Sequence, residues 1–125
     1  MSCGDDLFCG INKTKSTGVD GMPDLDKKHT PVIKAPAEVK KGEPFEVGIE
    51  VGKYLKHPNE NAHFIEWLEL YSGDTFLGRI DFVSRLTEPK VTLTVAVDHA
   101  HPLVARARCN LHGLWQSVDY PLSVV

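Results

Sequence analysis

Four histidines and one cysteine lie at or beside the ends of segments whose pattern is typical of strands. They are His29, His57, His63, Cys109 and His112. Imidazole nitrogen and thiolate sulfur are ligands for zinc, copper and iron. Binding sites are normally assembled on the loops at the ends of such elements. The set therefore predicts a mononuclear metal site, and leaves the choice among these three metals open.

The spacing of the five residues supports a shared ion. His57 and His63 flank residues 58–62, whose proline and polar side chains favour a turn that could bring both imidazoles toward one point. Cys109 and His112 are separated by two residues, so both can reach one ion across a tight turn. Taken singly, each histidine is as well explained as a surface residue, and Cys109 as a small buried hydrophobe. That alternative must treat all five positions as unrelated.

The elements that would position these residues are strands. Apolar and polar side chains alternate over residues 45–51, 91–97 and 105–109, which places Cys109 inward at a strand end. Further candidates are residues 31–33, 64–71, 75–83 and 115–122, separated by turn signals. No stretch has a helical period over three turns. About seven short strands predict an all-β, immunoglobulin-like seven-stranded β-sandwich.

The N-terminal residues have a different composition. Residues 1–26 are rich in Gly, Asp, Lys, Ser and Thr without periodicity, which predicts an extended, partly mobile arm ahead of a β-sandwich domain over residues 27–125. The arm carries Cys3 and Cys9, which we interpret as exposed thiols. Two thiols cannot complete a four-cysteine iron site, and a disulfide between them would need oxidation.

Composition excludes several classes of function. With 125 residues, the chain suits one compact domain. Acidic side chains outnumber basic ones, 17 to 14, and the basic ones are scattered, so nucleic-acid binding is not expected. The sequence shows neither a signal peptide nor an apolar stretch long enough to span a membrane. Three cysteines, an odd number, favour a reducing cytoplasmic location.

Three short stretches together resemble the superoxide reductase family of neelaredoxin and desulfoferrodoxin. The first is Lys28-His29 followed by Pro31, and the second is His57-Pro58-Asn59 with His63 six residues after His57. The third is Cys109-Asn110-Leu111-His112-Gly113-Leu114-Trp115. The resemblance covers about residues 27–120, and the order, spacing and neighbours of the candidate ligands all agree with it.

This resemblance implies one iron per chain and a defined activity. The four histidines would form the equatorial plane of a square-pyramidal Fe(II) site, with the thiolate of Cys109 as the axial ligand. Such a site reduces superoxide to hydrogen peroxide and is re-reduced by a small partner such as a rubredoxin-like protein. Lys28 matches a family lysine that attracts the anionic substrate. The resemblance also implies a homodimer or homotetramer.

One position departs from the family pattern. The family has Glu-Lys-His-x-Pro, and the glutamate position is Lys27 in this chain. The carboxylate that often binds resting ferric iron is therefore expected to be missing. Asp24 and Asp26 do not align with it. We expect the oxidised site to bear water, hydroxide or an external anion instead.

Two other classes of protein compete with this reading. A copper electron-transfer protein also combines histidines with a late cysteine, but usually adds an axial methionine beyond the cysteine-histidine pair, and the methionines here are Met1 and Met22. A structural zinc site needs four ligands, so a fifth would be surplus. His99 and His101 lie in an expected turn and are interpreted as bystanders.

Overall fold

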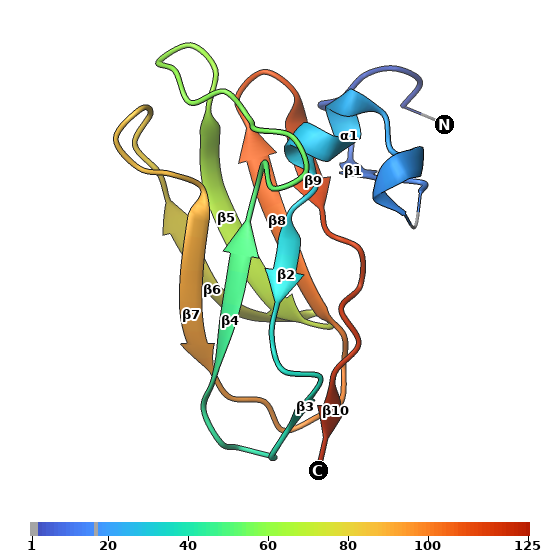
Figure 1. The fold of residues 1–125 in the computed structure, drawn as a ribbon, viewed down its shortest axis with the longest axis vertical. Coiled ribbons are helices and arrows are strands. Elements are labelled where there is room, and N and C mark those ends of the chain that lie inside the picture. Colours follow the sequence, from blue (N-terminus) through green and yellow to red (C-terminus); the bar gives the residue numbers. More distant parts are fainter. Residues whose placement is uncertain (1–2, 17) are drawn as a thin grey trace.

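The computed structural model describes residues 3–16 and 18–125, which form two facing β-sheets (Figure 1). The larger sheet has the strand order β1 (Ile11–Lys13), β9 (Gly113–Gln116), β8 (Leu103–Cys109), β5 (Ile65–Ser72) and β6 (Thr75–Asp81). The smaller sheet has the order β2 (Val32–Lys34), β4 (Phe45–Glu50) and β7 (Lys90–Val95). A third pairing joins β10 (Ser123–Val124) to β3 (Glu38–Val39).

The core lies between the two sheets because alternate residues of each strand point inward. Val47 and Ile49 of β4 contact the same hydrophobic cluster as Leu68 and Leu70 of β5, and all four are at most 1% exposed. Cys109, at the end of β8, belongs to this cluster and is fully buried, as its alternation with Arg108 predicts. The two packed sheets confirm a mostly β fold, to which the helix α1 (Asp24–His29) is added. The immunoglobulin-like topology stays a prediction.

Each of the seven predicted strand segments overlaps a strand of the structure, with shifted bounds. The largest difference is at residues 115–122, where β9 ends at Gln116 and only an isolated bridge joins Tyr120 to Leu103. The sequence did not reveal β1, β3 and β10, which have two or three residues each. An alternating pattern cannot be recognised over so few positions.

The N-terminal residues that the structure describes do not form an extended arm, so that prediction is wrong. β1 adds to the edge of the larger sheet, parallel to β9, and a 3₁₀ turn η1 (Val19–Gly21) leads to the helix α1 (Asp24–His29). The expected domain boundary after Asp26 falls inside α1. Cys3 and Cys9 are joined by a disulfide, contrary to the expectation of free thiols. Within the described ranges, no helix is long and apolar enough to cross a membrane.

Three segments meet at one end of the sandwich, and they carry the candidate ligands. They are α1, the β4–β5 loop over residues 51–64, and the β8–β9 turn over residues 110–112. Figure 1 shows α1 beside the ends of β8 and β9, with the β4–β5 loop reaching toward it. The sheets thus hold three separate parts of the chain against one point.

Candidate metal centre

The predicted ligands converge in space. One ligand atom from each of His29, His57, His63 and Cys109 lies within 4.8 Å of the others. His29 is 1% exposed and His57 is 4% exposed, whereas His63 and His112 are half-buried, so the cluster is closed to water on one side only. Buried histidines and a buried cysteine with converging donor atoms are the arrangement that a metal ion requires.

The imidazole of His112 completes a ring of four. Successive ring centroids are 4.7 Å apart from His29 to His57, 4.8 Å from His57 to His63, 5.0 Å from His63 to His112, and 4.9 Å from His112 to His29. Nδ1 of His112 lies 3.7 Å from Sγ of Cys109. All five predicted ligand residues therefore surround one small volume.

His29 lies just before β2, as predicted, but it also ends the helix α1, which the sequence analysis did not predict. It is the last residue of α1, and its Nδ1 lies 2.7 Å from the carbonyl oxygen of Leu25. Trp115 of β9 stacks on its ring at 5.0 Å between centroids, and Trp115 Nε1 donates to the carbonyl of His112 at 2.9 Å. Trp115 is thus a wall of the site that fixes two of its histidines.

The β4–β5 loop brings His57 and His63 together as the turn signals predicted. Gly52 has φ +88°, and a Cβ at this position would lie 2.7 Å from the backbone nitrogen of His57, so only glycine lets the loop fold back this closely. Glu60 and His63 then exchange two backbone hydrogen bonds, of 2.9 and 3.1 Å. This tight turn directs both imidazoles to the same side.

Asn110 joins the two ligand-bearing loops, a role that sequence reasoning missed. Its Oδ1 accepts a hydrogen bond from the backbone nitrogen of Phe64 at 2.9 Å, and its Nδ2 donates to the carbonyl of Ala62 at 2.9 Å. These bonds hold His63 next to the β8–β9 turn. This role could have been suspected from the sequence, because Asn110 directly follows Cys109 within residues 109–115, the most specific of the three stretches that resemble the family.

Ring nitrogens of this cluster face one another, and a bound cation would relieve the repulsion between their electron pairs. Nδ1 of His29 and Nδ1 of His57 each face a carbonyl oxygen, which can only accept, so both Nδ1 atoms carry the proton and each Nε2 presents a lone pair. Yet the two Nε2 atoms are only 3.2 Å apart. Nε2 of His63 is also buried without a hydrogen-bond partner. Two unprotonated nitrogens at this distance, beside a third buried nitrogen without a partner, fit a metal ion.

The pKa values of the histidines agree with this reading. Burial, as the largest cause, lowers the pKa of His29 from 6.5 to about 4, and the nearby His112 and His63 lower it further. The pKa of His57 is likewise lowered to about 4, first by burial and then by His29. Both imidazoles are therefore neutral at physiological pH and able to bind a metal without losing a proton.

Two opposing effects act on the pKa of the Cys109 thiol. Burial raises its pKa, whereas hydrogen bonds from the backbone at Leu111 and His112 act in the opposite direction and favour the thiolate. A bound cation deprotonates a coordinating thiol. The two backbone contacts would then limit the electron density that the sulfur gives to the metal.

Lys28 is close enough to influence the site. Its charge contributes to lowering the pKa of His29 and that of His63, and its side chain is partly buried. Asp26, one of the two carboxylates near the family's glutamate position, accepts a hydrogen bond from Thr14 at 2.9 Å. His99 and His101 contact each other in the β7–β8 connection, with ring centroids 5.9 Å apart, and are not part of the cluster.

The lowered histidine pKa values predict how the stability of the metal-free protein depends on pH. Between pH 6.5 and 4, His29 and His57 are protonated in the unfolded chain but stay neutral in the folded protein. The free energy of unfolding therefore falls as pH decreases through this window. From pH 7.5 to 5 we expect each histidine to contribute a loss of about 2 kcal/mol. Urea unfolding at both pH values measures the loss. His57→Gln should reduce it and His101→Gln, at an exposed position, should not; equal losses in both variants would contradict the assignment.

Comparison with known proteins shows similarity to desulfoferrodoxin and to superoxide reductases. The family model of desulfoferrodoxin matches residues 22–118. A relative from Methanocaldococcus jannaschii is 45% identical over 113 residues, which are 87% of this chain and 90% of the relative. The superoxide reductase of Pyrococcus horikoshii is 37% identical over 100 residues, 73% of this chain and 84% of that protein. The solved superoxide reductase (neelaredoxin) of Ignicoccus hospitalis is 38% identical with a TM-score of 0.77, covering 92% of this chain and 95% of that one.

Proposed function

We propose, because this chain belongs to the superoxide reductase and neelaredoxin family, that it reduces superoxide to hydrogen peroxide at a single iron ion. The observation that carries the proposal is the convergence of unprotonated imidazole nitrogens and one buried thiol on a common volume. The reaction consumes one electron and two protons for each superoxide, and forms no dioxygen.

We assign His29, His57, His63, His112 and Cys109 as the ligands that would hold the iron. Iron bound by these residues would supply the single electron that the reaction needs. The ring of four imidazoles gives neutral donors, and Cys109 gives the one anionic donor, which favours oxidation of the metal. The stacked Trp115 and the buried ring of His29 keep bulk water from that side.

Lys28 is the residue that we assign to the substrate. A positive charge next to the site raises the local concentration of an anion such as superoxide and offers a hydrogen-bond donor to the reduced product. Its influence on His29 and on His63 supports a position close to both. The two protons come from solvent or from a nearby acid.

The fifth donor distinguishes this proposal from its competitors. A closed zinc site would use four ligands, whereas His112 adds a fifth in contact with His29, His63 and Cys109. Met22 lines a different cavity, together with Val118 and Tyr120, so it does not provide the axial thioether of a copper electron-transfer site. A five-donor set with one thiolate supports iron.

The metal content per chain and the visible spectrum test the proposal. Protein purified from iron-supplied cells is expected to hold about one iron, with a thiolate-to-ferric band that appears on oxidation and disappears on reduction. Stoichiometric zinc or copper without that band would overturn the assignment of iron. The peroxide yield adds a second test: reduction gives one hydrogen peroxide per superoxide, whereas dismutation gives half as much and releases dioxygen.

The absence of a glutamate ligand is also part of the proposal, and Lys27→Glu tests it. In the ferric wild-type protein, azide or cyanide is expected to change the visible spectrum because no carboxylate closes the site. Lys27→Glu should raise the half-saturating anion concentration roughly tenfold or more, equivalent to about 1.4 kcal/mol. Lys41→Glu, in the turn before β4 at the far end of the sandwich, is the charge-matched control. If neither anion changed the visible spectrum of the ferric wild-type protein, another protein ligand would have to fill the position.

The physiological setting completes the proposal. We infer a cytoplasmic location, a small rubredoxin-like protein as the electron donor, and a homodimer or homotetramer as the working assembly. The proposed reaction calls for a separate electron donor, because iron that had given its electron to superoxide would have to be reduced again before the next turnover. Analytical ultracentrifugation measures the assembly, and a monomer at micromolar concentration would contradict it.

A further inference from the structure

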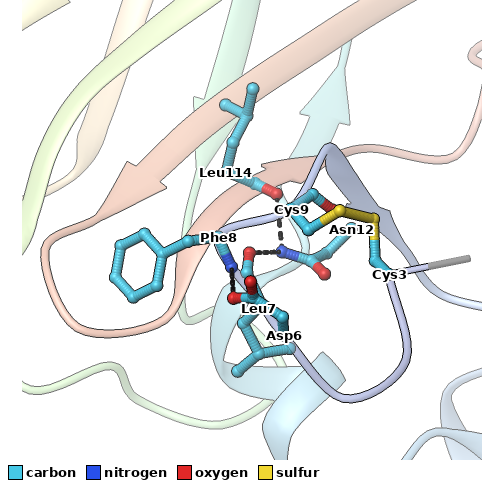
Figure 2. The surroundings of a disulfide bond; sticks show 7 residues. All are labelled: Cys3, Asp6, Leu7, Phe8, Cys9, Asn12 and Leu114. Atoms are coloured by element: carbon cyan, nitrogen blue, oxygen red, sulfur yellow. Dashed lines mark hydrogen bonds between the residues drawn. A yellow bond between two sulfur atoms is a disulfide. The ribbon is translucent and has the colours of Figure 1, made fainter.

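The Cys3–Cys9 disulfide closes a short loop next to the candidate metal centre. Both cysteines are exposed, whereas Cys109 is fully buried. The loop lies outside residues 22–118, so the match to the family model does not cover it. Inside the loop, the backbone nitrogen of Phe8 donates to the carboxylate of Asp6 at 3.0 Å (Figure 2).

The closed loop packs directly on the start of β9. Gly113 has φ +83°, and a Cβ there would lie 2.1 Å from the carbonyl oxygen of Leu7, so the loop backbone sits against the bare Cα of this glycine. Asn12 Nδ2 donates both to that same carbonyl, at 2.8 Å, and to the carbonyl of Leu114, at 2.9 Å. Figure 2 shows Asn12 joining Leu7 to Leu114, with the disulfide bordering the same loop.

Through these contacts the N-terminal segment, residues 3–16, connects to both sides of the site. Gly113 directly follows the candidate ligand His112, and β1 pairs with β9 next to Trp115, which stacks on His29. Thr14 Oγ1 donates to Asp26 of α1 at 2.9 Å, three residues before His29. The segment therefore links the β8–β9 turn to α1.

We propose that Cys3 and Cys9 form a thiol–disulfide exchange site whose redox state sets how firmly the protein retains its metal. The reductant is a protein or small molecule with two thiols. One of its thiolates attacks a sulfur of the disulfide to form a mixed disulfide, and its second thiol displaces the chain, leaving two thiols on this protein and one disulfide on the reductant. Two electrons and two protons are transferred in total.

Hydrogen peroxide is the oxidant that closes the loop again. It oxidises one thiolate to a sulfenic acid, which the second thiol converts to the disulfide, so that one peroxide and two thiols yield one disulfide and two waters. This part rests on the proposed function, because the peroxide is the product of that reaction. Peroxide formed at the site would thereby fix the N-terminal segment that contacts both the β8–β9 turn and α1.

The exposure of both sulfurs, together with the cytoplasmic location proposed above, supports exchange over a permanent structural bond. A thiol can reach both sulfurs from solvent, whereas Cys109 is shielded. In cytosolic proteins a disulfide is usually transient and catalytic or redox-sensing. Opening the disulfide removes the covalent closure of residues 3–9 at the point where Leu7 covers Gly113, and leaves the hydrogen bond from Asn12 to the Leu7 carbonyl to hold the loop against the β8–β9 turn.

Thiol counting tests the exchange site. The full-length metal-loaded protein is treated with dithiothreitol under native conditions, alkylated, and analysed by mass spectrometry. We expect Cys3 and Cys9 to become alkylated while Cys109 stays protected, and hydrogen peroxide to restore the disulfide. A disulfide that opens only in denaturant, or that peroxide does not restore, would overturn the proposal.

Metal release tests the consequence for the site. After anaerobic removal of dithiothreitol, an iron chelator is added, and we expect iron loss roughly tenfold faster from the reduced chain than from the oxidised one. Cys3→Ser combined with Cys9→Ser should match the reduced chain without any reductant. Amide hydrogen exchange should accelerate in β1 and β9 but not in β4 and β7, which serve as internal controls. Equal release rates would overturn the proposal, and because neither readout uses superoxide, failure of the proposed activity would be seen separately.

Discussion

Cys109→Ser is expected to abolish the thiolate-to-ferric band and to lower the rate of superoxide reduction by more than roughly 100-fold. Loss of a partner that only hydrogen-bonds a metal ligand already costs about 10–100-fold, and Cys109 is the one anionic donor of the set. A serine hydroxyl is harder, less basic toward iron and a weaker electron donor than a thiolate. Visible spectroscopy of the oxidised protein and pulse radiolysis measure the two effects.

The control for this variant is the chain that keeps Cys109 but lacks the other two cysteines. Cys3→Ser combined with Cys9→Ser should retain the band once the iron is loaded, because neither sulfur belongs to the cluster. Circular dichroism would show whether Cys109→Ser still folds, since the side chain is fully buried. A folded, iron-loaded Cys109→Ser protein with an unchanged band would show that the band does not come from this thiolate.

Gly113→Ala is expected to lower the free energy of unfolding by about 3 kcal/mol. The residue has a left-handed conformation, and its new Cβ would lie 2.1 Å from the carbonyl oxygen of Leu7. Both obstacles are backbone constraints, so a side-chain rotation cannot relieve them. The loop of residues 3–9 must move away, and with it the packing on the β8–β9 turn. Urea unfolding of the metal-free protein measures the loss.

Gly78→Ala is the matched control for this effect. Gly78 lies in β6, and a Cβ there would meet only Cδ1 of Leu93, at the ordinary contact distance of 3.6 Å. Its alanine variant should therefore change the free energy of unfolding by less than about 1 kcal/mol. If Gly113→Ala were as stable as Gly78→Ala, the close approach of Leu7 to Gly113 would not exist in solution.

The strands and the ligand types could be read from the sequence because both are local properties. The alternation over residues 45–51 follows from the two-residue repeat of a strand, and it correctly placed Cys109 inward. The proline and polar residues between His57 and His63 predicted a turn, which the structure confirms at Glu60 and His63. The spacing from Cys109 to His112 likewise required only a short turn.

Other parts of the site depend on contacts between distant segments. α1 has six residues, fewer than two helical turns, so no periodicity could reveal that His29 ends a helix. β1 is stabilised by pairing with β9, about 100 positions later, and its three residues carry no strand pattern of their own. The bonds of Asn110 to Ala62 and Phe64 span 48 and 46 positions. None of these has a signature in the neighbouring residues.

The amino-acid sequence was thus sufficient for the donor atoms and for the sheets that carry them, since residue type and two-residue periodicity are properties of short stretches. Tertiary structure decided how those donors face one another. Three contacts exist only because the two sheets hold separate segments at one end. They are the 3.2 Å approach of the His29 and His57 nitrogens, the stacking of Trp115 on His29, and the packing of the Cys3–Cys9 loop on Gly113. Such packing depends on the whole chain, because each segment is held by partners far away in sequence.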